Sequence, residues 1–298
     1  MVRLLHFGRC HSDTIAVAMT VRKVIFGLAG LVLAAVSFGV ANNNFPRTST
    51  SRAEFEEKLN RSYLAASEWM RAQDREPNIY LTYMVENCAV LSGDTRLRRF
   101  AERVYNQDPD PPNVRMLDPS APFFSPPSRY VEQLADYQRW LLHAISWKEF
   151  PLTEADKAEM FRADKHRTGR ATHQLFALLF YREFNGETPA LNALIRRISE
   201  RIAQEAALDF RVTDLYLQRI AFLLAAGQSD LVQPRWVERA LASQEPSGAW
   251  YYGWYGWQPT PYRFDIEEVE NSHTTAQGLW LTCMLKYRYP EWVSAHYK

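Results

Sequence analysis

The chain has 298 residues, 47% of them hydrophobic, and a formal net charge of +1 at pH 7. A chain of this length can bury one substantial core in one or two domains. General nucleic-acid-binding domains usually carry a clear basic excess, so we expect no nucleic-acid partner. Residues 1–41 carry a net charge of +3, which leaves the rest of the chain weakly acidic and favours no class of charged partner.

Near the N-terminus, an uncharged apolar run covers residues 24–41 and follows the basic pair Arg22-Lys23. These 18 residues, as a helix, just span the hydrocarbon of a bilayer. The basic pair places the residues before it in the cytoplasm and the residues after the apolar run outside. We therefore expect a cleaved signal peptide, with Gly39-Val40-Ala41 at its end, or a retained membrane anchor. The run is longer than a usual signal core, which favours the anchor.

This arrangement divides the rest of the chain. Residues 1–23 form either a cytoplasmic segment or an extension ahead of a true start at Met19. Residues 42–50 have the composition of a polar tether. Residues 51–298 then form a folded domain outside the cytoplasm, in the periplasm or at the cell surface. An oxidising compartment would permit a disulfide between the two cysteines of this domain, Cys88 and Cys283, although two buried free thiols agree equally well with the sequence.

Within residues 51–298, apolar residues recur at helical spacing, and no segment shows the period-two alternation of a strand. The predicted helices cover roughly 51–73, 78–92, a segment after Asp94, Ser128 to Ile145, a shorter segment after Leu152, 171–185, a segment from Thr188, 212–227, a segment from Pro234, and 273–289. Short turns make sequential helices antiparallel hairpins. The sequence therefore predicts an all-α domain.

Residues 108–127 interrupt this pattern, because seven of the chain's 16 prolines fall within them. Proline lacks an N–H and restricts the residue before it, so we expect neither a helix nor a central strand here. Met116, Leu117, Phe123 and Phe124 are unusual in a solvated linker. We therefore expect a loop that packs on the domain.

One motif near the C-terminus resembles that of a known superfamily. Gln244-Glu-Pro-Ser-Gly248-Ala-Trp250 is similar to the Gln-x-x-x-Gly-x-Trp motif of the α/α-toroid proteins, which include terpenoid cyclases and prenyltransferases. The Gln amide can bond the backbone of a neighbouring helix end, the Gly allows a tight turn, and the Trp packs over the junction. The resemblance implies helix hairpins in a partial or complete α/α toroid. This fold is shared with polysaccharide lyases and hydrolases that bind sugars on aromatic platforms.

The residues that would bind a metal in such proteins are missing. His273-Thr274 stands where prenyltransferases of this fold carry a zinc-binding His-Thr, but the Asp-x-Cys pair that completes that site is absent. The cyclases' Asp-x-Asp-Asp motif, the Asp-Asp-x-x-Asp motif and the His-x-x-x-His and Cys-x-x-Cys spacings are absent too. We therefore predict no metal and no cofactor.

The segment after the motif is rich in aromatic residues, with eight of them among residues 250–264. Trp and Tyr present a large face and a polar tip, which suits stacking on a sugar or a peptide. The predicted ligand-binding residues of this segment are Trp250, Tyr252, Trp254, Trp257 and Tyr262. The alternative is that the tryptophans close the end of the helical ring.

Acidic residues and a histidine come next, and Asp265, Glu268 and His273 are the predicted catalytic residues. Burial or like charges would raise one carboxyl pKa for acid–base chemistry, although acidic runs also precede helix N-termini without a catalytic role. We predict ligand contacts for His173, which would face His273 across a ring. We predict them also for Arg170, which would receive an anionic sugar or phosphate unless it belongs to a solvated loop.

Three functions remain open. The first is a binding or scaffold protein, tethered to the membrane through residues 24–41, whose aromatic surface takes a glycan or a protein partner. The second is a carbohydrate-active lyase or hydrolase that uses Asp265 or Glu268 with His273. The third is an enzyme similar to terpenoid cyclases. If Asp265 or Glu268, together with His273, lay close to His173 or Arg170 in one concave pocket, the arrangement would favour an enzyme.

Overall fold

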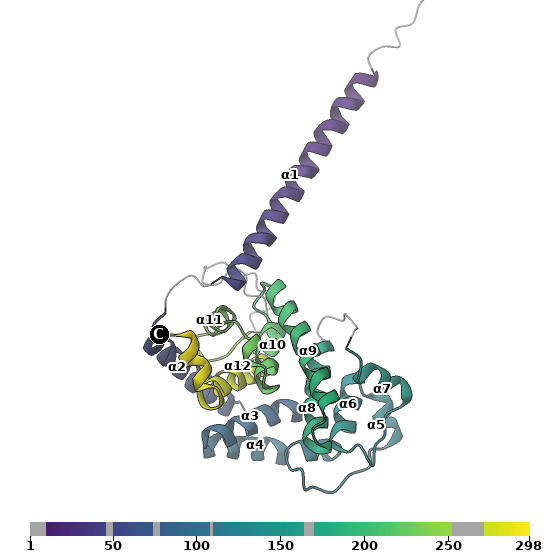
Figure 1. The fold of residues 1–298 in the computed structure, drawn as a ribbon, viewed down its shortest axis with the longest axis vertical. Coiled ribbons are helices and arrows are strands. Elements are labelled where there is room, and N and C mark those ends of the chain that lie inside the picture. Colours follow the sequence, from purple (N-terminus) through teal and green to yellow (C-terminus); the bar gives the residue numbers. More distant parts are fainter. Residues whose placement is uncertain (1–9, 46–49, 74–77, 108–109, 164–169, 252–270) are drawn as a thin grey trace, which may run out of the picture.

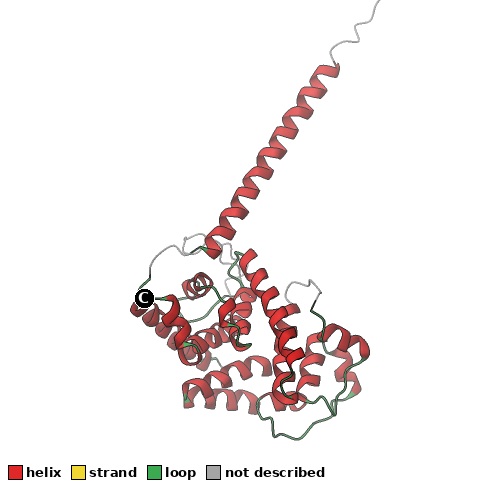
Figure 2. Ribbon diagram, in the orientation of Figure 1, coloured by secondary structure: helices red, strands yellow, loops and turns green. Residues whose placement is uncertain are grey.

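The computed structural model describes residues 10–45, 50–73, 78–107, 110–163, 170–251 and 271–298 (Figure 1). These residues form helices and contain no β-strand, which confirms the all-α class (Figure 2). The α-helices are α1 (Cys10–Asn44), α2 (Arg52–Arg71), α3 (Ile79–Ser92), α4 (Thr95–Gln107), α5 (Ser128–Gln133), α6 (Asp136–Ile145), α7 (Glu154–Met160), α8 (Arg170–Asn185), α9 (Pro189–Leu208), α10 (Asp214–Ala225), α11 (Pro234–Ala242), α12 (Ser272–Cys283) and α13 (Pro290–His296).

The N-terminal helix α1 projects away from the other helices over most of its length (Figure 1). Its residues Ile25–Asn44 are long and apolar enough to cross a membrane, and only 11% of their most apolar stretch is buried. The apolar run of the sequence is therefore a helix that could serve as a signal or an anchor. Asn42–Asn44 do not begin a tether, because they continue α1 and their side chains hydrogen-bond to the domain.

Helix α12 lies inside the domain, where it packs against α2, α3 and α10. Every residue from Thr274 to Cys283 is buried, so this helix has no solvent face. An all-round buried helix needs neighbours on every side. The Trp280 ring meets three of them, since its centroid lies 5.8–6.2 Å from those of Tyr83, Phe176 and Phe222.

Five helices, α3, α6, α8, α10 and α12, are called the core helices. Helix α3 packs on α12, α12 on α10, α10 on α8, and α8 on α6. Tyr80 of α3 and Tyr137 of α6 lie with their ring centroids 6.4 Å apart, so the series of contacts returns to α3. The remaining helices pack against this set; α4 contacts α3, and α9 contacts α8 and α10.

The segment after α11 forms the turn and the Trp contact expected of its motif, but its Gln bonds the middle of a neighbouring helix instead of a helix end. The Gln244 amide donates to the carbonyl oxygens of Ser62 in α2, at 3.0 Å, and of Gly248, at 2.9 Å. The Trp250 indole N–H donates to a carbonyl oxygen near the end of α11 at 2.9 Å. Its ring covers Gly278, where a Cβ would come within 2.6 Å of the indole. The motif thus ties α11 to α2 and α12.

Two predicted helices are interrupted. Leu134 has an extended backbone with ψ of 135°, which separates α5 from α6. Leu134 is nevertheless buried, so the apolar spacing continues across the break. The sequence pattern therefore does not reveal the break. After α12 comes a π-helical turn, Met284–Arg288, and Pro290 then begins α13 instead of ending the last helix. Proline suits the first position of a helix, where its missing N–H costs no hydrogen bond.

The described part of the proline-rich segment packs on the domain, as expected, but it includes a 3₁₀ helix, Pro111–Met116. Met116 is buried, and the Arg115 guanidinium donates to the Ala121 carbonyl oxygen at 2.9 Å. A 3₁₀ turn tolerates proline at its first positions because those N–H groups have no intrahelical partner. Phe124 stays exposed.

The two cysteines of the domain are buried neighbours. Cys88 in α3 and Cys283 in α12 have free thiols and no exposed surface. The Cys283 thiol donates to the Cys88 carbonyl oxygen at 3.6 Å. Burial raises the pKa of the Cys88 thiol, and the Cys283 side chain raises it further. The free-thiol alternative is the one that the structure shows.

Candidate active site

The first turns of the five core helices surround a cavity of about 40 Å³. Each core helix contributes to its lining, through Tyr80 (α3), Tyr137 (α6), His173 (α8), Gln218 (α10) and His273 (α12). All of these residues lie near the N-terminal ends of their helices, so the core helices run in one direction. We call this space the histidine cavity.

His273, in the wall of this cavity, forms a hydrogen-bonded pair with Asp214 behind it. Nδ1 of His273 lies 2.7 Å from Oδ1 of Asp214, and the Thr274 hydroxyl donates to the same oxygen at 3.2 Å. A carboxylate only accepts hydrogen bonds, so this contact places a proton on Nδ1 and selects the neutral tautomer whose Nε2 can accept one. The Asp214 side chain is 16% exposed and that of His273 36%, so the carboxylate is shielded while the ring reaches solvent.

A helix cap holds the His273 member of the pair. The Asn271 side-chain oxygen accepts from the backbone N–H groups of His273, at 2.8 Å, and Thr274, at 3.2 Å. Such an N-cap satisfies donors that the helix itself leaves unpaired and fixes the first turn. Asp214 is the first residue of α10. The pair therefore belongs to two ordered helix ends, which hold it more rigidly than loops would.

One turn further along α12, Gln277 lies against the His273 ring. Its amide nitrogen is 3.3 Å from Nδ1 and 3.4 Å from Nε2, near the limit of hydrogen-bond distance. Gln277 is fully buried, and its Oε1 has no hydrogen-bond partner among the described residues. An unpaired buried acceptor costs about 1–3 kcal/mol. Such a position is a candidate for a functional role.

His173 and Tyr137 also line a neighbouring hollow of about 460 Å³, together with Asp136, Trp140 and Arg170. The His173 and Tyr137 rings lie against each other, with centroids 4.4 Å apart. The Arg170 guanidinium donates to Asp136 Oδ2 at 2.9 Å. The hollow thus joins an aromatic face to a polar, charged rim, a combination found in sites for small polar ligands.

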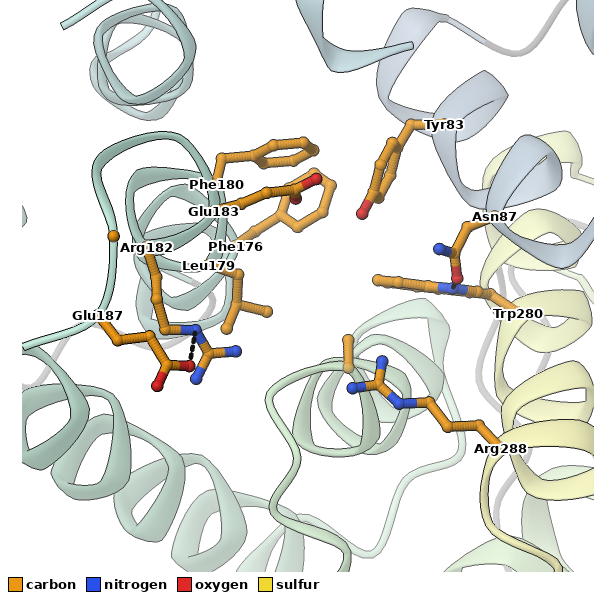
Figure 3. A pocket seen from close by; sticks show the side chains of 12 residues that line it. Tyr83, Asn87, Phe176, Leu179, Phe180, Arg182, Glu183, Glu187, Trp280 and Arg288 are labelled. Carbon is orange, nitrogen blue, oxygen red and sulfur yellow. Dashed lines mark hydrogen bonds and ion pairs between the residues drawn. The ribbon is translucent and has the colours of Figure 1, made fainter. Parts of the chain in front are cut away.

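The opposite ends of the core helices hold a second opening, of about 540 Å³, which we call the aromatic pocket (Figure 3). Its aromatic residues are Tyr83, Phe176, Phe180 and Trp280, and its polar and charged residues are Asn87, Arg182, Glu183, Glu187 and Arg288. The Trp280 indole N–H donates to Asn87 at 2.7 Å, which holds the ring in the wall. Burial raises the pKa of the Glu183 carboxyl, and Arg182 opposes this.

The structure brings together three of the predicted site residues. His173 and His273 share the histidine cavity, and Arg170 shares the adjoining hollow with His173. Six others, Tyr252, Trp254, Trp257, Tyr262, Asp265 and Glu268, lie outside the described residues. Trp250 is only 1% exposed, so the predicted ligand contact is corrected to a packing role between α11 and α12.

Sequence reasoning missed Asp214 and Gln218. Thr213-Asp214 begins a predicted helix, where an acidic residue is common because it complements the helix dipole. Because this local explanation was sufficient, no pattern in the sequence paired Asp214 with His273. Gln218 lies one turn later and accepts from the Thr172 hydroxyl at 2.9 Å, a contact between distant helices that no spacing reveals.

Within the described ranges, no group of three or more His, Cys, Asp or Glu side chains is placed to hold a metal ion. Comparisons with models of protein families, with curated proteins and with solved structures find no match for this chain. The function proposed below is therefore argued from the residues and geometry of the site.

Proposed function

We propose that the protein is a membrane-anchored enzyme that uses the His273–Asp214 pair as a general base on a carbohydrate, as a hydrolase or a lyase. The observation that carries this proposal is the 2.7 Å contact between Nδ1 of His273 and Oδ1 of Asp214, since His273 lines a cavity that His173 also lines. A carboxylate on Nδ1 orients an imidazole so that Nε2 accepts a proton.

The pair would act in the same way in both reactions. In hydrolysis, Nε2 of His273 takes a proton from the attacking water, and in elimination it takes one from a carbon of the substrate. Asp214 stabilises the imidazolium that forms. His173 lines the same cavity and would donate a proton to the departing oxygen. Arg170, in the adjoining hollow, would bind an anionic group of the substrate.

A carbohydrate is the substrate class that best fits the adjoining hollow. Its aromatic wall, with Tyr137 against His173, offers a flat face for a sugar ring. The Arg170–Asp136 ion pair offers donors and acceptors for hydroxyl groups at the rim. A purely apolar substrate such as a terpenoid would form no hydrogen bonds with these charged groups, so the hollow favours a sugar.

We further propose that the core helices form a closed α/α ring of five. The contact of Tyr80 with Tyr137 completes the series of helix contacts, and the motif at Gln244 joins the outer helices as the resemblance implies. We also assign the domain to the outside of the cytoplasm. The support is the basic pair Arg22-Lys23 ahead of the apolar part of α1.

The aromatic pocket supports a second function, the binding of a small polar ligand without conversion. Its walls carry four aromatic rings, and Arg288 and Glu183 bring opposite charges to the rim. Figure 3 shows Tyr83 and Trp280 facing Phe176 and Leu179 across the opening. This role would agree with the binding function that the sequence predicts, but none of the predicted ligand residues that the structure describes lines the aromatic pocket.

The test is an activity screen with the full-length chain in phosphatidylcholine nanodiscs. Polysaccharides and glycosides are incubated with the protein, and new reducing ends or the ultraviolet absorbance of an unsaturated sugar are measured. We expect His273→Gln to lower the rate on any substrate found by about 10²–10⁴-fold, because the general base is lost. The matched control is His296→Gln, in α13, whose Nδ1 contacts only the Trp292 carbonyl oxygen at 2.8 Å.

Equal rates in His273→Gln and the wild type would contradict the proposal. A sugar that binds without being converted, and whose binding is lost in Arg288→Gln, would favour the aromatic pocket and the binding role.

A further inference from the structure

The end of α1 is locked into the domain by three consecutive asparagines. Asn43 occupies the centre of this dock, since its amide nitrogen donates to the Ala206 carbonyl oxygen at 2.7 Å. Its side-chain oxygen accepts from the Tyr216 hydroxyl at 2.8 Å and from the Arg239 guanidinium at 2.5 Å. Asn43, Tyr216 and Arg239 are each at most 1% exposed. The amide therefore joins α1 to three other helices in a dry environment.

The flanking asparagines extend the dock on both sides. The Arg235 guanidinium donates to the backbone and side-chain oxygens of Asn42, at 3.0 and 3.1 Å. The Trp236 indole N–H donates to the Asn44 side chain at 3.3 Å. Cleavage after Ala41 would place a new ammonium group on Asn42, beside the buried Arg235 guanidinium. Like charges repel strongly where water is excluded, so the dock suits a chain that stays uncut.

Because α1 continues as a helix into the dock, the apolar stretch and the domain form one rigid unit at this point. A flexible tether would let the domain rotate freely above the membrane. A helix fixed by buried hydrogen bonds instead holds one face of the domain toward the bilayer. That face is the one from which α1 rises, beside α11 and the end of α9 (Figure 1).

The histidine cavity lies close to this face. The Phe210 ring packs on Gly39 of α1, where a Cβ would come within 2.8 Å of it. Asp214, the partner of His273, comes four residues after Phe210, a stretch that spans at most about 14 Å. The aromatic pocket is far away, since its lining includes Gly186 and Glu187, just before the start of α9. Helix α9 has 20 residues and measures about 30 Å from there to the dock.

Two exposed apolar side chains flank the dock. Phe45, just after α1, and Leu208, the last residue of α9, are each 68% exposed. Large apolar side chains in such positions favour the interfacial layer of a bilayer over water. They are adjacent to the apolar helix and continue its surface onto the domain. The bilayer that surrounds the apolar part of α1 would therefore also cover Phe45 and Leu208.

We propose that the dock holds the histidine cavity against the bilayer, so that its substrate is an amphiphile in the membrane, a lipid that carries a sugar head group. This inference rests on the proposed function of the His273–Asp214 pair. The apolar tail stays in the bilayer beside Leu208, and the head group reaches the first turns of α8, α10 and α12. Asp214 lies no more than about 14 Å along the chain from Phe210, which packs on α1, so a head group at the bilayer surface is within a short distance of the His273–Asp214 pair.

The orientation is tested by spin labels on the full chain in phosphatidylcholine nanodiscs, in a Cys10→Ser background. One label is placed at Leu208→Cys and the matched control at Glu187→Cys, and the accessibility of each to oxygen and to a water-soluble nickel complex is compared. We expect the label at 208 to lie at membrane depth and the label at 187 to lie in water. Equal exposure of both labels to the nickel complex would overturn the proposal.

A third sample adds Asn43→Ala to the label at 208, with circular dichroism as the check on folding. If the dock sets the orientation, the folded variant loses the membrane depth of this label. If the variant does not fold, the labels at 208 and 187 in the background chain still test the orientation of the domain. A folded variant in which the label at 208 keeps its membrane depth would show that the dock does not orient the domain on the bilayer, which also overturns the proposal.

The substrate class is tested with a dialkyl glucoside that carries a diazirine on its sugar, placed in the same nanodiscs. We expect light to cross-link it to peptides that contain His173, Gln218 or His273. Cross-links confined to Phe45 and Leu208, or to the aromatic pocket, would overturn the inference. If a soluble glycoside is nevertheless converted, and His273→Gln abolishes this, the proposed function stands and only the membrane substrate fails.

Discussion

Gly248→Ala is expected to leave little folded protein. Gly248 has φ of 98°, a conformation that an L side chain rarely adopts, and a Cβ would lie 2.3 Å from the Ala65 carbonyl oxygen. The obstacle is backbone in the middle of α2, which cannot yield as a flexible side chain would. The Gln244 amide bonds Gly248 and α2 together, so a shift of either element breaks the junction. We expect a loss of more than about 4 kcal/mol, a large part of the stability of an ordinary domain.

Gly186→Ala is the matched control. Gly186 also has a positive φ, of 86°, but no atom lies within 4 Å of the Cβ position. Its substitution should cost only the backbone strain, of about 1–3 kcal/mol. Urea unfolding followed by circular dichroism measures both variants. Equal loss of stability in the two would mean that α2 does not pack against the turn at Gly248.

Asp214→Asn is expected to lower kcat by about 10²–10⁴-fold on the substrate that the screen identifies, with a smaller change in KM. An amide keeps the size of the carboxylate but can donate to Nδ1, which would move the proton to Nε2 and remove the base. It also cannot stabilise the imidazolium. Because Asp214 accepts from Thr274 as well, the amide can remain in place and the fold should persist.

The combination of Asp214→Asn with His273→Gln separates this account from a structural one. The two groups act as a unit, so the double variant should be about as slow as the slower single variant. Additive losses would mean that the two side chains contribute independently. A melting temperature far below that of the wild type in Asp214→Asn alone would assign the loss of activity to unfolding.

Much of the architecture could be predicted from local patterns. Apolar spacing located the helices because each buries one face along its length. The Gln244–Trp250 segment could be interpreted in detail, because each of its three motif residues has a role that suits its side chain. The Gln amide bonds a backbone carbonyl, the Gly adopts a positive φ, and the Trp packs on the junction and bonds a carbonyl. The break at Leu134 and the helix after Pro290 escaped prediction, because apolar spacing continues across the first and proline can both end and begin a helix.

The site was harder to predict because it depends on residues far apart in the chain. His273 and His173 were visible as histidines at the starts of helices. Asp214 was not, because its contact with His273 joins residues 59 positions apart and its place at a helix start already had a local explanation. Asn42–Asn44 looked like a polar tether by composition, whereas their side chains find buried partners more than 160 residues away.

The central claim is that His173 and His273 face one ligand, and histidine footprinting tests it most directly. The full-length protein is treated with diethyl pyrocarbonate at increasing concentrations of the substrate from the screen, and modification of each histidine is measured by mass spectrometry. The account predicts that His173 and His273 are protected together, with the same midpoint, while His296 is unaffected. Protection of only one of the two, or protection with different midpoints, would contradict it.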